Sequence, residues 1–248
     1  MDAEEQPLVE HLIDLRKSLL RSLVFFVICF AASLLFINKL IPIITQHHEL
    51  VMIGPLDVIR LYTGIAASVS LGLSLPFIAH QLWLFVRPAL TKNERNAAVK
   101  FLPAISLSFI GGLLFGYFVI FPTIYHFLIE MGQEHFKMFI SAKEYFSFLL
   151  MFTIPFGFLF EVPLVLLFLT TIGVITPSSL GTIRKYAYIV LAIVSAVITP
   201  PDFFSQLIVL APLIVLYEIG VFLSKMKFKK AIKLRDWNQG DGSHASEA

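Results

Sequence analysis

Residues 22–38 read SLVFFVICFAASLLFIN and contain no charged side chain. A helix that crosses the hydrocarbon core of a bilayer needs about 20 mostly apolar residues. Extended to residue 40, this stretch meets that requirement and predicts a membrane-spanning helix. It does not have the pattern of a cleaved signal peptide, because acidic residues begin the chain and no Ala-x-Ala site follows the apolar run.

The composition of the whole chain agrees with this first segment. Of 248 residues, 57% are hydrophobic and 15% are charged, whereas a soluble domain has about 45–50% apolar and about 25% charged residues. A soluble globular enzyme is therefore excluded, and 25 phenylalanines exclude a disordered chain. The single cysteine, Cys29, excludes a disulfide framework, and the net charge of +2 argues against nucleic-acid binding. We predict an all-α, polytopic membrane protein.

Six transmembrane helices are predicted, at residues 22–40, 61–85, 101–121, 145–172, 186–198 and 203–223. The last two are short and flank an outer turn, Thr199-Pro200-Pro201-Asp202. A helix over residues 186–198 measures about 20 Å, against a hydrocarbon core of about 30 Å. Either the bilayer thins there or neighbouring spans shield the helix ends. Alternatively, the fifth helix begins near the Thr176-Pro177 pair and tilts.

The placement of Lys and Arg predicts the orientation, because short cytoplasmic loops collect positive charge. With the amino terminus inside, the predicted inner segments hold 15 of the 19 Lys and Arg residues. The outer side keeps only Lys39, Arg60, Lys137 and Lys143. Six spans return the carboxyl terminus to the inside. The predicted organisation is a cytoplasmic amphipathic helix over residues 1–21, a membrane domain over residues 22–224, and a tail over residues 225–248 that is basic and then disordered.

The predicted amphipathic helix carries the first candidate binding residue. Its apolar stripe repeats at helical spacing in Leu8, Leu12, Leu15 and Leu19. We expect an interfacial helix that turns into the membrane and holds Asp14 at the level of the lipid headgroups. Asp14 either belongs to an ordinary solvated face or takes part in binding. His11 beside Asp14 is too weak a pattern for a metal site, so no metal is predicted.

A second acidic residue stands in the loop before the third span. Thr91-x-x-Glu94 has the spacing of a capping box, in which Glu94 bonds back to the backbone amide of Thr91. A capping glutamate can still offer its outer oxygen to a guest cation. Asp14 and Glu94 together suit a ligand with two adjacent guanidinium groups, because the planar fork of arginine meets a carboxylate bidentately and lysine does not.

Polar residues inside the apolar spans form a third group of candidates. Glu161 lies between Pro155 and Pro163 in the fourth span, and prolines there predict a kinked helix. Its carboxyl group is either functional or a hydrogen-bonding strut between helices, and the same alternatives apply to Gln206 and Glu218, with the strut favoured for Glu218. A Gly112-x-x-x-Gly116 pair permits close helix approach, and packing within the monomer is favoured over dimerisation.

Six motifs follow one another along the predicted spans: His11-Leu-Ile-Asp-Leu-Arg16; Gln81-Leu-Trp-Leu-Phe-Val-Arg-Pro-Ala-Leu90 with Glu94-Arg95; Gly116-Tyr-Phe-Val-Ile-Phe-Pro122; Phe160-Glu-Val-Pro163; Thr199-Pro-Pro-Asp-Phe-Phe-Ser-Gln206; and Tyr217-Glu-Ile-Gly-Val221. In this order they closely resemble the TatC family, the polytopic core subunit of the twin-arginine protein translocase. The resemblance covers about residues 7–224.

The resemblance implies a concave, glove-like arrangement of six helices with both termini cytoplasmic. It also implies a receptor for the Arg-Arg signal peptides of folded proteins, which are exported using the proton-motive force by an oligomeric complex. The implied partners are TatA-type single-span subunits, with or without separate TatB-type subunits. Family signal-peptide residues correspond here to Asp14, Arg16, Phe85, Glu94 and Arg95. The family usually has glutamate in place of Asp14, so the shorter aspartate is expected to contribute less than Glu94.

The resemblance also places Glu161, Gln206 and Glu218 on the concave polar face. We expect the region of Glu161 and Gln206 to contact a small single-span partner. A second hypothesis is a proton-coupled secondary transporter with Glu161 as the proton carrier. An intramembrane enzyme is not expected, because the spans lack paired Asp, Ser/His or His-Glu-x-x-His sets, and no cofactor is predicted. Without a long amino-terminal extension, a bacterial plasma membrane is the expected location.

Overall fold

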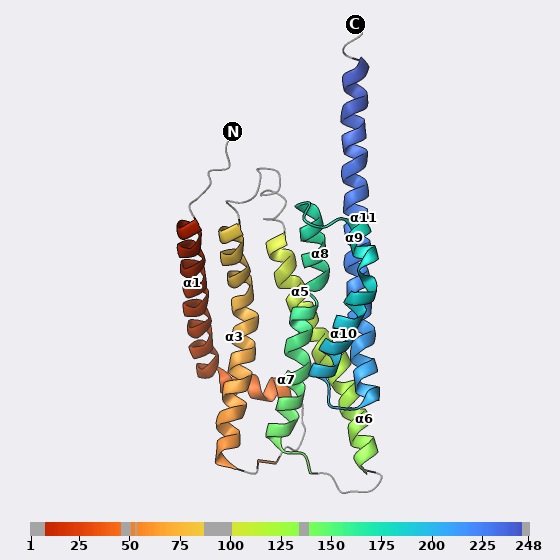
Figure 1. The fold of residues 1–248 in the computed structure, drawn as a ribbon. Coiled ribbons are helices and arrows are strands. Elements are labelled where there is room, and N and C mark those ends of the chain that lie inside the picture. Colours follow the sequence, from red (N-terminus) through yellow and green to blue (C-terminus); the bar gives the residue numbers. More distant parts are fainter. Residues whose placement is uncertain (1–7, 46–50, 53, 87–100, 134–138, 245–248) are drawn as a thin grey trace. The chain divides into compact units, whose positions relative to one another are not determined.

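The computed structural model describes residues 8–45, 51–52, 54–86, 101–133 and 139–244. Regular structure in these ranges is almost entirely helical, apart from one isolated β-bridge between Val51 and Ser141. The chain divides into two compact units, Met1–Phe158 and Leu159–Ala248. Each unit is described by itself, and Figure 1 shows its helices.

Unit 1 contains the following helices: α1 (Leu8–Leu35), α2 (Ile37–Thr45), α3 (Pro55–Val86), α5 (Phe101–Phe115), the π-helical turn η2 (Gly116–Ile120), α6 (Phe121–Gln133) and α7 (Ala142–Leu159), the last residue of which already belongs to unit 2. Unit 2 contains α8 (Val162–Thr171), α9 (Pro177–Thr182), α10 (Arg184–Ile198) and α11 (Phe203–His244). The all-helical prediction is therefore confirmed.

Five helical segments of the described chain are long and apolar enough to cross a membrane: Leu12–Leu35, Pro55–Leu82, Pro103–Gln133, Ala142–Thr171 and Phe203–Lys229. They correspond to five of the six predicted spans. The remaining one corresponds to α10, which has 15 residues and a length of about 22 Å. The sixth crossing therefore stays a prediction.

The structure excludes the alternative of one longer fifth helix that begins near Thr176. Thr176 does cap a helix, since its side chain accepts a hydrogen bond from the Ser179 amide. That helix is the short α9, which ends at Thr182, and α10 begins separately at Arg184 after the intervening Ile183.

The predicted amphipathic segment and the first span lie in one continuous helix. A single helix, α1, continues from Leu8 to Leu35, because nothing in this stretch interrupts it: it contains neither Gly nor Pro. The chain breaks instead at Phe36, after which α2 lies crosswise to α1 and α3 (Figure 1). The first span therefore ends earlier than the predicted residue 40.

The segment after residue 224 continues the last helix over the described residues. Helix α11 has 42 residues and continues to His244, which corresponds to about 63 Å. No proline follows Pro212, and eight of the eleven residues 225–235 are Lys, Ala, Leu or Arg, which favour helices.

The Gly112-x-x-x-Gly116 pair packs within the chain, as predicted. A Cβ atom on Gly112 would collide with the carbonyl oxygen of Phe156 and lie 2.9 Å from the Cα atom of Gly157. A Cβ atom on Gly116 would lie 2.9 Å from the Cα atom of Thr153. These two glycines therefore let α5 and η2 approach the backbone of α7 within unit 1.

Candidate functional site

Asp14 lies near the amino-terminal end of α1, at the start of the Leu12–Leu35 segment. Its carboxylate meets the Lys17 ammonium at 3.8 Å, and the two side chains are 49% and 60% exposed, respectively. An ion pair this exposed contributes only about 0–1 kcal/mol, so it does not hold the carboxylate away from a guest cation. Arg16, two residues further on, is exposed.

Phe85 is brought to the same end of unit 1 by the packing of α1 against α3. The two helices run antiparallel, with the Phe25 and Phe77 rings stacked at 4.3 Å and the hydroxyls of Ser33 and Ser70 at 3.2 Å. From the stacked rings, Asp14 lies about 16 Å along α1 and Phe85 about 12 Å along α3 in the same direction.

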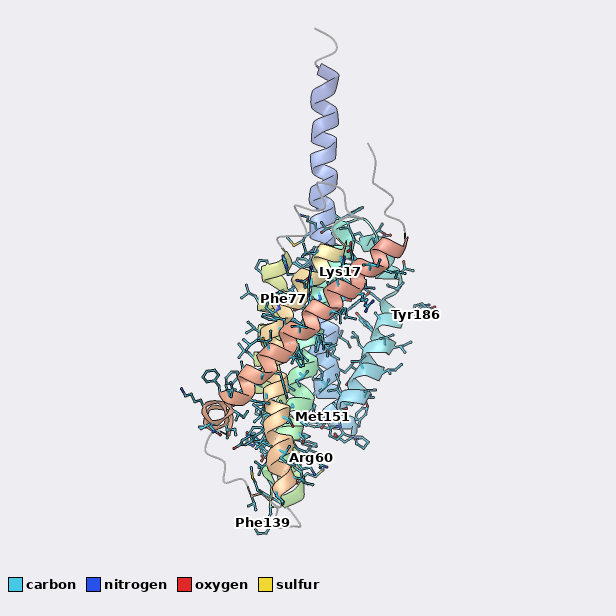
Figure 2. All side chains as sticks on the ribbon, turned by 90° about the vertical axis from the view of Figure 1, so that its left-hand side faces the viewer. Lys17, Arg60, Phe77, Phe139, Met151 and Tyr186 are labelled. Carbon is cyan, nitrogen blue, oxygen red and sulfur yellow. The ribbon has the colours of Figure 1, made fainter. Side chains whose placement is uncertain are left out.

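The opposite end of unit 1 is distinct from this candidate site. Figure 2 shows Lys17 and Phe77 towards one end and Arg60 and Phe139 towards the other. At the far end, the Lys143 ammonium lies 3.9 Å from the Asp57 carboxylate. Three predicted site elements, Glu94, Arg95 and the capping box that begins at Thr91, lie outside the described residues.

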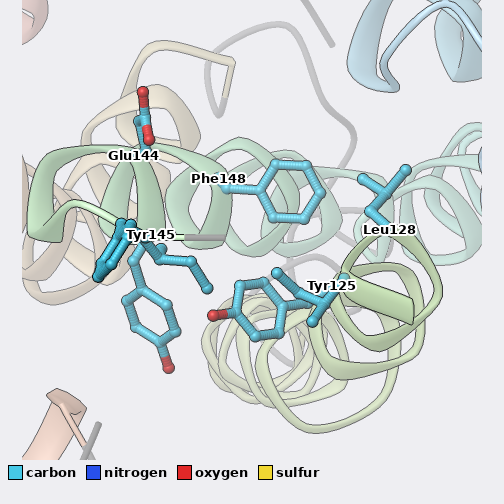
Figure 3. A pocket seen from close by; sticks show the side chains of 8 residues that line it. Tyr125, Leu128, Glu144, Tyr145 and Phe148 are labelled. Atoms are coloured by element: carbon cyan, nitrogen blue, oxygen red, sulfur yellow. The ribbon is translucent and has the colours of Figure 1, made fainter. Parts of the chain in front are cut away.

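A cavity of about 210 Å³ lies between α6 and α7 at the far end. Figure 3 shows the rings of Tyr125, Tyr145 and Phe148 around it, with the Glu144 carboxyl group pointing away from these rings. The lining is mainly apolar and includes none of the predicted site residues. This cavity therefore adds no polar group to the candidate site.

Glu161 lies where the fourth predicted span is interrupted. Helix α7 ends at Leu159 and α8 begins at Val162, with Glu161 at the N-cap position and its carbonyl accepting from the Val165 amide at 2.9 Å. The helix is interrupted where the prolines predicted a kink, because Pro163 has no amide hydrogen to donate to the carbonyl of Leu159. Both interpretations of the Glu161 carboxyl group stay predictions.

Gln206, near the start of α11, is bonded to α10. Its side-chain amide donates to the Ala192 carbonyl at 3.4 Å, and its backbone carbonyl accepts from the Ser195 hydroxyl at 2.7 Å. Ser195 is fully buried. The polar group of Gln206 thus joins two helices of unit 2.

Glu218 is bonded to α10 as well, with both oxygens. Oε2 accepts from an Arg184 guanidinium nitrogen at 2.8 Å, and Oε1 accepts from the Tyr188 hydroxyl at 2.7 Å. This arrangement is the one that the strut interpretation of Glu218 expects. Neither Arg184 nor Tyr188 was among the predicted site residues. Arg184 was visible only as one positive charge in a predicted inner loop.

The turn over residues 199–202, which was predicted to lie outside, gives Asp202 a local role at the start of α11. Its Oδ1 atom accepts from the Ser205 amide at 2.6 Å, which is the bond of a helix N-cap. Its own amide donates to the Pro200 carbonyl at 2.7 Å, and the exposed Pro201 completes the turn. Thr199 is buried and donates to the Ser195 carbonyl at 2.9 Å. The turn is thus a compact link between α10 and α11.

Long apolar helices with few, mutually bonded polar residues define a multi-pass, α-helical membrane protein. The sequence model of Sec-independent protein translocase protein (TatC) matches residues 10–212. The chain belongs to the TatC family, as the sequence motifs predicted, and it is a transport protein with a role in protein translocation.

Individual relatives agree along almost the whole chain. Sec-independent protein translocase protein TatCd of Bacillus subtilis is 38% identical over 235 residues, which cover 94% of this chain and 97% of the relative. TatC of Escherichia coli is 36% identical over 230 residues, covering 90% and 89%. A crystal structure described as the twin arginine translocase receptor TatC superposes with a TM-score of 0.77 at 33% identity, covering 87% of this chain and 98% of that one.

Proposed function

We propose that this chain is the receptor subunit of a twin-arginine translocase. It binds the Arg-Arg signal peptides of folded proteins at the end of unit 1 that carries Asp14, Arg16 and Phe85, together with Glu94 and Arg95. With TatA-type single-span subunits, and with or without TatB-type subunits, it exports these proteins across the plasma membrane using the proton-motive force. Family membership and the similarity to a translocase receptor structure support this proposal.

The observation that carries the proposal is the exposed Asp14 carboxylate at the same end as Phe85. Its lysine partner lies at 3.8 Å on the next helical turn, so an arginine of the peptide can displace that lysine at little cost. A guanidinium offers two parallel N–H donors to one carboxylate, whereas an ammonium does not. The site therefore favours arginine over lysine at each acidic residue.

Peptide titration in detergent tests this proposal. Asp14→Ala and Glu94→Gln should weaken binding of an Arg-Arg signal peptide about 10- to 100-fold, because a charge-assisted contact contributes about 1.5–3 kcal/mol. The affinity for a Lys-Lys peptide should fall less, because lysine makes no bidentate contact with the carboxylate that these substitutions remove. Asp14→Glu should bind at least as tightly as the unmodified chain.

Asp57→Asn is the matched control, because it removes one carboxylate at the opposite end of unit 1, where Asp57 pairs with Lys143. It should leave the affinity for both peptides unchanged. Equal losses of affinity for the Arg-Arg and Lys-Lys peptides, or no loss in either site variant, would show that these two acidic residues do not distinguish arginine from lysine.

The orientation with both termini inside is part of the same proposal. It is supported by the 15 of 19 Lys and Arg residues in the predicted inner segments. Single cysteines in a Cys29→Ser background test it with a membrane-impermeant maleimide on intact cells. A cysteine at Arg16 should stay unlabelled and one at Phe139, which is exposed, should react. The reverse pattern would overturn the orientation.

The partner is proposed to contact the region of Glu161 and Gln206. Polar side chains within apolar spans usually face other protein segments rather than lipid, and the resemblance to the TatC family implies that these two residues belong to one polar face. A photocrosslinker placed at Phe158, which is exposed and close to Glu161 in sequence, should capture the single-span subunit. Capture from Phe158 equal to that from the distant, exposed Leu35 would argue against a specific contact.

A further inference from the structure

Helix α10 is bonded to α11 by side chains near both of its ends. At its first turns, Arg184 and Tyr188 donate to the two carboxylate oxygens of Glu218 at 2.8 and 2.7 Å. Towards its last turns, Ser195 and Gln206 form hydrogen bonds at 2.7 and 3.4 Å with backbone carbonyls of the opposite helix. The two polar residues predicted in the last span are thus both used within unit 2.

The bilayer alone cannot set the depth of such a short helix. α10 has 15 residues and measures about 22 Å, which is less than a hydrocarbon core of about 30 Å. A segment shorter than the core is free to shift, or is accommodated by its surroundings, at modest cost. Its position along α11 therefore depends on the bonds that the two helices share.

Glu218 supplies the negative charge that balances the cations at the start of α10. Arg184 and Lys185 occupy the first two positions, where the helix dipole is positive and disfavours cations. No side chain caps this helix, and the Lys185 ammonium lies 5.1 Å from the centre of the Tyr186 ring, which points away from α10 in Figure 2. The Nε atom of Arg184 is buried without an acceptor among the described residues.

We propose that Arg184 and Tyr188 are positioning residues, which together with Glu218 fix the depth of α10 along α11. In this arrangement the carboxylate of Glu218 acts within the chain and is not a contact for a partner subunit. The export readout of this inference rests on the proposed function, whereas its geometric readout does not.

Neutralising one or both charges distinguishes a role of Glu218 within the chain from a direct contact with a partner subunit. Glu218→Gln leaves the half-buried Arg184 guanidinium without a counter-charge, and we expect export of an Arg-Arg reporter protein to fall about tenfold. Arg184→Gln/Glu218→Gln removes both charges, which is close to neutral for an ion pair, and export should return to within about twofold of the unmodified chain. Lys225→Gln removes one exposed cation of the same helix region and should export normally.

A direct contact between Glu218 and a partner predicts the opposite for the double variant. Without the carboxylate that contact stays lost, whatever happens at Arg184. Export of the double variant as low as that of Glu218→Gln would therefore overturn the inference.

The geometry is measured with spin labels at Ile189 and Phe222 in a Cys29→Ser background, because both side chains are exposed on α10 and α11. The unmodified pair and the double neutral variant should give one narrow distance distribution. Glu218→Gln should broaden or shift it, and Tyr188→Phe, which removes one hydrogen bond, should do so less. Identical distributions in all four proteins would show that the cluster does not position α10.

A measurement of signal-peptide binding distinguishes failure of the proposed function from failure of the positioning role. The peptide site belongs to unit 1, so Glu218→Gln should bind an Arg-Arg peptide as the unmodified chain does. Absence of binding to the unmodified chain would refute the proposed function and leave the distance measurement as the test of the positioning residues.

Discussion

Replacement of Gly112 by alanine should separate α5 from α7. The new Cβ atom would collide with the Phe156 carbonyl oxygen and lie 2.9 Å from the Gly157 Cα atom. Both obstacles are backbone, so no side-chain rotation relieves the overlap. Overpacking of a tight interface costs about 1–3 kcal/mol, and we expect about 3 kcal/mol here, because two helix backbones must move apart.

Thermal unfolding of the purified protein in detergent measures this effect. A loss of 3 kcal/mol corresponds to a decrease in Tm of about 6–12 °C for a chain of this size. Gly116→Ala should also be destabilising, since its Cβ atom would lie 2.9 Å from the Thr153 Cα atom.

Gly181→Ala is the matched control, because nothing lies within 4 Å of its Cβ position in helix α9. It should leave the Tm unchanged or raise it, since alanine favours helix over glycine by about 0.5–1 kcal/mol. If Gly112→Ala melted within about 2 °C of this control, the two glycines would not define the α5–α7 contact, and the close approach described above would be wrong.

Three further substitutions probe local features by the same Tm measurement. Asp202→Ala removes the N-cap of α11 and should cost about 1 kcal/mol, whereas Asp202→Asn should cost less; equal losses would exclude the capping role. Gly173→Ala places a side chain at a φ of +77° and should cost about 1–2 kcal/mol, and an unchanged Tm would contradict a left-handed residue there. Phe152→Ala empties a fully buried position and should cost about 3–5 kcal/mol; a loss no larger than that of the exposed Phe158→Ala would show that Phe152 is not in the core.

Features that depend on neighbouring residues were predictable from the sequence. The apolar runs indicated where the long helices lie, because the hydrocarbon core demands a minimum length of apolar helix. Pro163 predicted the interruption beside Glu161. Each of these signals acts over one or two helical turns, so no knowledge of the fold was needed.

Two predicted segment boundaries follow a change in polarity and do not coincide with a change in secondary structure. The boundary between charged and apolar residues near Ser22 does not interrupt α1, since both kinds of residue continue a helix equally well. The basic segment after Lys225 likewise continues α11. Solvation and helicity are therefore independent properties of these two segments.

The candidate site was predictable as a set of residues but not as an arrangement. Asp14 and Phe85 were identified from separate segments, and the antiparallel packing of α1 on α3 brings them to one end of unit 1. The interpretation of Glu218 as a strut agrees with its bonds, yet nothing in the local pattern identified Arg184 and Tyr188, which are 34 and 30 residues away along the chain.

The amino-acid sequence by itself determined that this protein resides in a membrane, where its long helices lie, and to which family it belongs. These properties follow from the length of the apolar segments, the placement of charges and the order of the motifs, all of which depend only on the linear order of the residues. Only the tertiary structure decided which polar side chains meet. Hydrogen bonds form over about 3 Å in space, and two helices can satisfy each other's polar groups in many registers until packing selects one.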